Sequence, residues 1–205
     1  RDPLWSRGLG DVYKRQYPHL RVPMWKDTPW CVLVEISDNE SEEHARGLFE
    51  RLLETAFEAG VVADAIVAES IKQAHDLWHI RESISLAQAE EGLNIKHDIS
   101  IPVSLIPEFV READAALSAA IPGVRFVNFG HLGDGNLHYN IQAPVDGDPK
   151  AFLRDREEEI NTIVYDTVSR YHGSISAEHG VGELKRHKLP KHKSPVALTL
   201  MHAIK

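Results

Sequence analysis

Residues 130–140, Gly-His-Leu-Gly-Asp-Gly-Asn-Leu-His-Tyr-Asn, constrain the fold of this chain more than any other segment. Asp134-Gly135 between strand-forming residues predicts a β-hairpin with a two-residue turn, because both positions tolerate a positive φ. In that register His131 faces His138. Directly opposed residues share one face of a sheet, with Cβ atoms roughly 5 Å apart. The hairpin can therefore direct two imidazoles towards one metal ion.

A third ligand is expected, because two histidines alone make a poor zinc site. Residues 174–182, Ser-Ile-Ser-Ala-Glu-His-Gly-Val-Gly, offer Glu178 among small residues and glycines, which suits a backbone that approaches another group closely. His131, His138 and Glu178 would form a two-histidine, one-carboxylate site with positions left for water or substrate. Adjacent residues usually point to different sides, so His179 would be free to act as an acid or a base.

These residues also have simpler interpretations. The chain holds 12 histidines, so a pair seven residues apart arises easily by chance. Asp134 fits a turn better than a metal site. Asn140 lies two residues after His138 and shares its face, where it either donates a hydrogen bond into the site or only closes the strand.

A second set of polar residues could bind a carboxylate. Arg81 and Ser85 are four residues apart and share one face of a predicted helix, and Lys96 begins the next strand. An arginine and a lysine that point into one cavity would bind a carboxylate, the arginine through two hydrogen bonds. Taken alone, these residues are better explained by a solvated helix face. The basic run at residues 185–193 is expected to be solvated surface that could attract an anionic substrate.

The predicted elements alternate between strands and helices. Strands are expected at residues 30–36, 61–68, 96–101, 124–129 and 137–141, and helices at 41–59, 69–91, 104–120 and 148–171. Two helices have clear buried stripes, formed by Ile106, Val110, Ala113 and Leu117 and by Ile160, Val164, Val168 and Tyr171. The order predicts an α+β fold, with a ferredoxin-like duplicated antiparallel sheet and helices mainly on one face.

The composition excludes several classes of protein. The formal net charge of −8 argues against a nucleic-acid-binding protein. One cysteine, Cys31, excludes an internal disulfide framework and fits a reducing compartment such as the cytoplasm, while peripheral association with a membrane stays open. No apolar run approaches the roughly 20 residues that a transmembrane helix needs.

Both ends of the sequence are unusual. Residues 1–16 show no helical or strand period and no signal-peptide core, and we interpret them as a non-native, adapter-derived segment. Residues 194–205 begin an amphipathic helix that has no C-terminal cap. We therefore expect residues 17–205 to be one domain of a longer protein, truncated at both ends.

Four segments together resemble a known family: LWHIRESIS, NIKHDISIPVS, FGHLGDGNLHYNI and SISAEHGVGELKRHKL. They are similar to the C-terminal, substrate- and metal-binding domain of FAD-linked oxidases of the vanillyl-alcohol-oxidase superfamily. The similarity is to the branch of D-2-hydroxyglutarate dehydrogenases, D-lactate dehydrogenases and the glycolate oxidase FAD-linked subunit. It covers residues 17–205, and its motifs occur in the order of the family.

The resemblance implies roles for individual residues. It makes His131, His138 and Glu178 ligands of a divalent metal, zinc being the expected ion, and His179 the base that takes the hydroxyl proton. It also assigns substrate binding to a further set: Arg81, Ser85, Lys96 and Asn140. The implied reaction is metal-assisted oxidation of a small D-2-hydroxy acid to a 2-oxo acid, with hydride transfer to FAD.

The resemblance also implies what the chain lacks. Family members carry a separate FAD-binding domain with a glycine-rich loop, which this sequence does not contain, so the chain alone is expected to be inactive. The residues that contact FAD, the electron acceptor and the exact substrate stay unknown, and a homodimer is an open expectation. A stand-alone metallohydrolase and a non-catalytic metal-binding domain are the alternative functions.

Overall fold

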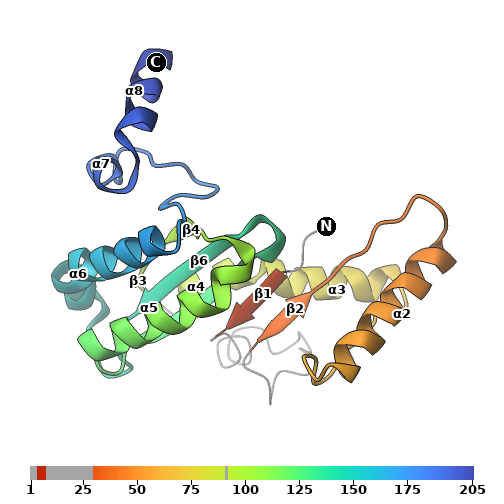
Figure 1. The fold of residues 1–205 in the computed structure, drawn as a ribbon. Coiled ribbons are helices and arrows are strands. Elements are labelled where there is room, and N and C mark those ends of the chain that lie inside the picture. The colour runs from red at the N-terminus through yellow and green to blue at the C-terminus, as the bar shows by residue number, and fades with distance from the viewer. Residues whose placement is uncertain (1–3, 8–29, 91) are drawn as a thin grey trace. The chain divides into compact units, whose positions relative to one another are not determined.

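The computed structural model describes residues 4–7, 30–90 and 92–205. The chain divides into two compact units, Arg1–Glu91 and Gly92–Lys205, which we consider one at a time (Figure 1). The structure combines helices with antiparallel strands, so the expected α+β class is confirmed.

The first unit holds a strand pair and three helices. Strand β1 (Leu4–Arg7) pairs antiparallel with β2 (Cys31–Leu33), so part of the segment that we expected to lack strand character forms a strand. Most of residues 1–16 lie outside the described part of the chain, and their adapter origin stays a prediction. The helices are α2 (Glu42–Glu58), α3 (Ile71–Glu82) and α4 (Ile84–Glu90).

Two predictions for the first unit are wrong. Residues 61–68 form no strand, since they make no ladder with any described neighbour and β-branched side chains such as Val61 stay exposed. A high β-propensity therefore does not produce a strand without a packing surface and a hydrogen-bonding partner. The helix expected at residues 69–91 is divided at Ser83, whose hydroxyl donates to the carbonyl of His79, a bond that often bends a helix.

The second unit is built on an antiparallel sheet. Its central strand is β6 (Asn136–Gln142), which pairs with β5 (Arg125–His131) on one edge. On the other edge it pairs first with β3 (Asn94–Ile95) and then with β4 (Asp98–Ser100). Of the predicted strand at residues 96–101, only β4 forms, and Lys96 and His97 make the break between β3 and β4.

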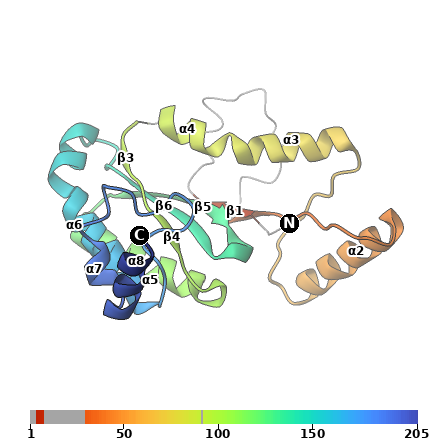
Figure 2. The same ribbon diagram turned by 90° about the horizontal axis from the view of Figure 1, so that it is seen from above.

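Two helices cover one face of this sheet (Figure 2). A short 3-10 turn, η1 (Val103–Leu105), leads into α5 (Ile106–Ala120), and α6 (Pro149–Arg170) follows β6. Pro107 stands in the first turn of α5, and the Asp148 carboxylate caps α6 by accepting from Lys150 N–H, both as helix starts favour. Seven of the eight residues of the two predicted stripes are buried: Ile106, Val110, Ala113, Leu117, Ile160, Val164 and Val168. The eighth, Tyr171, is half-buried, and its hydroxyl donates to Glu112.

The opposite face of the same sheet is polar. Because side chains alternate along a strand, Tyr139 and Ile141 point to the helices while His138, Asn140 and Gln142 point away from them. This polar face carries the candidate site.

The strand register of the hairpin differs from the predicted register by two residues. Phe129, not His131, stands opposite His138, and four residues close the loop: a 3-10 turn, η2 (Leu132–Asp134), and Gly135 at φ 69°. The two-residue Asp-Gly turn was therefore wrong. A shift of two keeps every side chain on its face, so His131 and His138 still share the polar face as diagonal neighbours.

The chain ends in two further helices, α7 (Leu189–His192) and α8 (Pro195–Ile204). The hydroxyl of Ser194 caps α8 by accepting from Ala197 N–H, so the helix expected near the end of the sequence is present. Among the described residues, no helix combines the length and apolar character that crossing a membrane would require.

Candidate metal centre

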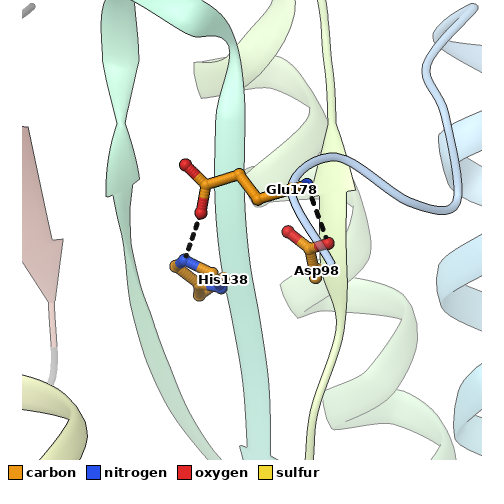
Figure 3. Close-up of side chains that lie close together, drawn as sticks. All are labelled: Asp98, His138 and Glu178. Carbon is orange, nitrogen blue, oxygen red and sulfur yellow. Dashed lines mark hydrogen bonds and ion pairs between the residues drawn. The ribbon is translucent and has the colours of Figure 1, made fainter. Parts of the chain in front are cut away.

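The predicted trio His131, His138 and Glu178 lies together. Glu178 Oε1 is 3.3 Å from His131 Nδ1, and its other oxygen, Oε2, is 3.5 Å from His138 Nε2. Figure 3 shows the Glu178 side chain turned towards His138 while its backbone N–H points to Asp98. The hairpin thus supplies both imidazoles, and the segment after α6 supplies the carboxylate.

Each histidine nitrogen lies at a suitable spacing from one Glu178 oxygen. Donor atoms bound at about 2.0–2.2 Å around a tetrahedral Zn²⁺ lie roughly 3.3–3.6 Å apart, close to the two distances above. The two distances end on different Glu178 oxygens, and the described ligand atoms that all lie within 4.8 Å of one another belong to Asp98, His138 and Glu178, without His131. His131 Nδ1 is buried and makes no hydrogen bond with any residue that the structure describes. A buried ring nitrogen without a hydrogen bond is costly, and a metal ion would satisfy it. Two imidazoles and a carboxylate are also ligands that zinc accepts.

Asp98 is a fourth group at this site, which the sequence analysis missed. It stands opposite His138 in the β4–β6 ladder, and ligand atoms of Asp98, His138 and Glu178 lie within 4.8 Å of one another. Asp98 is buried, with 5% of its surface exposed, whereas Glu178 is exposed. The available signal was the alternation of residues 96–101. It places Asp98 on the same face as Lys96, a predicted substrate-binding residue.

The Asp98 carboxylate accepts four hydrogen bonds. Oδ2 accepts from the backbone N–H groups of Ala177, Glu178 and His179, at 3.2, 3.0 and 2.9 Å. Oδ1 accepts from the side-chain amide of Asn136 at 3.1 Å. Burial alone would raise the pKa of Asp98, but the hydrogen bonds from these backbone N–H groups and a Coulombic interaction with His179 lower it below its ordinary value.

The segment that carries Glu178 pairs with the end of strand β4, upstream of its contact with Asp98. Ser174 and Ser100 exchange two backbone hydrogen bonds, of 3.0 and 2.8 Å, in an antiparallel bridge. A Cβ on Gly173 would collide with the carbonyl oxygen of Ser100, so only glycine permits this approach. The Ser174 hydroxyl donates to the Ser176 carbonyl and tightens the next turn.

His179 lies beside the trio and not within it. Its ring centroid is 5.6 Å from that of His138, and its side chain is exposed. It shares no hydrogen bond or ion pair with Glu178 among those that the structure describes. This arrangement leaves the imidazole available to a bound molecule.

The His97 side chain, just before β4, forms hydrogen bonds that connect this part of the sheet to helix α6. Its ring is fully buried, with Nδ1 2.8 Å from the Tyr139 carbonyl oxygen and Nε2 2.9 Å from the side-chain amide of Asn161 on α6. Burial lowers the pKa of His97 to about 4, although both hydrogen bonds oppose this shift. The ring is therefore neutral at pH 7.

Lys185 departs from the expected solvated basic run. It is half-buried, donates to the Ile175 carbonyl at 3.1 Å and lies 5.9 Å from the centre of the Tyr165 ring. Burial lowers the pKa of Lys185, while the charge of Asp98 opposes this. Two others of the run form ion pairs, Lys188 with Glu158 and Lys191 with Asp166.

The expected substrate-binding residues lie on different parts of the chain. Asn140 is buried, and its side-chain oxygen accepts from His97 N–H at 3.3 Å, which bridges the break between β3 and β4. Lys96 is exposed at that break, on the second unit. Arg81 on α3 and Ser85 on α4 belong to the first unit. Their convergence on one ligand stays a prediction.

Comparison with known proteins gives a consistent result. The family described as "FAD linked oxidases, C-terminal domain" matches residues 15–205. A D-2-hydroxyglutarate dehydrogenase of Stutzerimonas stutzeri (strain A1501) is 38% identical over 200 residues, which cover 97% of this chain and 40% of that protein. The mitochondrial D-2-hydroxyglutarate dehydrogenase of Arabidopsis thaliana is 36% identical, over 95% of this chain and 33% of its own length.

A further relative is named after a different substrate. A putative mitochondrial D-lactate dehydrogenase of Schizosaccharomyces pombe is 32% identical over 93% of this chain and 36% of its own length. The chain therefore spans two fifths or less of the length of these relatives.

Proposed function

The chain belongs to the family of FAD-linked oxidases, within their C-terminal domain, and from this we propose that it forms the substrate- and metal-binding part of a D-2-hydroxy-acid dehydrogenase. The reaction is the oxidation of the 2-hydroxyl of a small acid to a 2-oxo group. The observation that supports it most is the convergence of His131, His138 and Glu178 beside His179. The names of the relatives favour D-2-hydroxyglutarate or D-lactate as the substrate class.

His131, His138 and Glu178 hold a divalent metal, with zinc the ion that their donor atoms suit best. When bound, such an ion supplies a Lewis acid that favours the alkoxide of the substrate hydroxyl. The protein contributes the fixed placement of the donors. Both histidines are held by the hairpin, and the Glu178 backbone is held by Asp98.

His179 acts as the base. The hydrogen bonds that Asp98 accepts from backbone N–H groups orient residues 177–179. The exposed imidazole of His179 lies next to that of His138. A base must reach the proton that it removes. A hydroxyl held at the trio would lie beside His179, whose ring nitrogen takes the proton.

The remaining predicted residues orient the substrate. Arg81 and Lys96 bind its carboxylate groups, Ser85 donates a hydroxyl, and Asn140 lines the substrate. Orientation of this kind supplies much of the rate of such sites. FAD, when bound, supplies the hydride acceptor, and we assign its binding mainly to a separate domain, as the family implies.

Turnover by the gene product that carries this chain tests the proposal. We expect a yellow protein that oxidises D-2-hydroxyglutarate or D-lactate with an artificial electron acceptor and that loses activity with a chelator. Glycolate is a third substrate to compare, and L-isomers serve as controls. A colourless protein, or hydrolysis of esters or phosphoesters in place of oxidation, would contradict the proposal.

A further inference from the structure

A buried carboxylate that binds three consecutive backbone N–H groups organises the segment around it. Oδ2 of Asp98 does this for Ala177, Glu178 and His179, the residues that carry the proposed metal-binding carboxylate and the proposed base. Successive N–H groups that converge on one anion form a binding concavity for it. Here the anion belongs to the protein, on a strand 79 to 81 residues away in sequence.

The protein itself uses most of the acceptor capacity of Asp98. An ionised carboxylate offers about four lone-pair directions, two on each oxygen. Three N–H groups converge on Oδ2, and the Asn136 amide takes one direction of Oδ1. Glu178 is the opposite case, because each of its oxygens faces a histidine at 3.3 or 3.5 Å. We therefore assign the metal to Glu178 and the backbone N–H groups to Asp98, although both carboxylates lie near His138.

Within the part of the chain that the structure describes, the segment has no other side-chain anchor as strong at this point. Upstream it is held by the Ser100–Ser174 bridge and by Lys185, whose ammonium donates to the Ile175 carbonyl. Hydrogen bonds to an ionised acceptor are roughly twice as strong as neutral ones. Asp98 therefore sets the backbone direction at Glu178 and His179, whose side chains must point to different sides.

We propose that Asp98 is the positioning residue of this site: without touching metal or substrate, its carboxylate sets the backbone from Ala177 to His179 so that Glu178 faces the two histidines and His179 faces the substrate. The proposal rests on the proposed function for the roles of Glu178 and His179. The arrangement of the backbone by Asp98 can be measured without any metal.

Amide hydrogen exchange of the metal-free chain gives the first readout. Asp98→Ala removes the acceptor, and we expect the amides of residues 177–179 to lose most of their protection. Asp98→Asn keeps one acceptor oxygen without the charge. Asn136, whose side-chain oxygen has no hydrogen-bond partner among the described residues, can turn its amide to accept from the new NH₂ group. Exchange in this variant should be faster on the order of tenfold.

Zn²⁺ affinity gives the second readout, with two control variants. Loss of a group that orients a ligand costs about 10–100-fold in metal affinity, and we expect Asp98→Asn to lie in that range. Glu178→Ala should lose Zn²⁺ binding but keep protected amides at residues 177–179. Asp114→Asn changes a carboxylate that accepts from the Tyr139 hydroxyl, and it should alter neither readout.

The results separate positioning from ligation. Weaker Zn²⁺ binding by Asp98→Asn with unchanged exchange at residues 177–179 would make Asp98 a ligand and overturn the proposal, as would unchanged values of both. If Asp98→Ala does not fold, Asp98→Asn decides alone. A wild-type chain that binds no Zn²⁺ contradicts the proposed function, while the exchange of metal-free protein still decides whether Asp98 holds the segment.

Discussion

Glu178 and His179 are neighbours in sequence whose side chains lie in different surroundings, and we propose different roles for them. The Glu178 carboxylate lies between two histidine rings, whereas the His179 ring is exposed beside one of them. Residues 177–179 form bends, and their backbone N–H groups converge on Asp98. The sequence predicted that the two side chains point to different sides, while their roles stay predictions.

His179 provides the first prediction. His179→Gln should lower kcat of the gene product that carries this chain by about 10²–10⁴-fold, because it removes the base. Its Zn²⁺ content should stay at the wild-type value, since His179 is not a ligand. Steady-state kinetics and metal analysis of one preparation check both points.

The exposed His202 on α8 offers a matched control. His202→Gln should leave kcat and metal content unchanged. Wild-type turnover by His179→Gln, or loss of its metal, would remove the proposed role of this residue.

His97 provides a prediction about pH. Its pKa is about 4 in the folded chain and 6.5 when unperturbed, so the unfolded state takes up a proton first as the pH falls. Stability should therefore be at its full value above pH 6.5 and decline between pH 6.5 and 4, by up to about 3 kcal/mol. Denaturant titrations across this range measure the decline.

His97→Gln removes the titrating group and should flatten this part of the profile, whatever it does to absolute stability. His202→Gln should keep the wild-type slope. A variant at position 97 with an unchanged slope would show that other groups cause the decline.

At the scale of elements, the hairpin shows what sequence patterns can and cannot predict. The strands and their faces follow from alternation, but the turn was wrong because a four-residue loop satisfies the same Asp-Gly signal. The shift of two residues preserved the faces and hence the pairing of His131 with His138. Asp98 was missed because its partners, the N–H groups of residues 177–179, are distant in sequence and carry no side-chain signal.

Gly135 in this loop gives the third prediction. It has φ 69°, and a Cβ there would collide with the Ile101 carbonyl oxygen. Gly182 has φ 58° with nothing near its Cβ position. Gly182→Ala should thus cost only the strain of the left-handed backbone, about 1–2 kcal/mol, while Gly135→Ala should cost about 1–3 kcal/mol more because of the collision.

Free energies of unfolding in denaturant compare the two variants directly. Equal losses for Gly135→Ala and Gly182→Ala would mean that the loop does not pack against Ile101 as described.

At the scale of the whole molecule, the second unit matched its predicted order of strands and helices better than the first unit did. Its strands pair with one another and its helices bury clear apolar stripes, so local pattern and packing agree. In the first unit, residues 61–68 have strand-forming side chains but no partner strand. Which strands pair is a property of the assembled sheet, which local sequence does not encode.

Metal binding should stabilise the chain as a whole. A ligand that binds only the folded state at 100 times its Kd adds about 2.7 kcal/mol. We therefore expect Zn²⁺ to raise the Tm of the wild-type chain, a chelator to reverse this, and His138→Ala to abolish it. His44→Ala, which removes an exposed histidine of α2, should retain the full increase, and a Zn²⁺-dependent Tm in His138→Ala would place the stabilising site elsewhere.

The central claim is that His131, His138 and Glu178 form one metal centre. Anomalous diffraction from a crystal of the chain grown with Zn²⁺ tests this most directly. We expect a single strong peak bound by Nδ1 of His131, Nε2 of His138 and a carboxylate oxygen of Glu178, with Asp98 still holding the backbone N–H groups beside it. A peak at other residues, or a site that stays empty at saturating Zn²⁺, would contradict it.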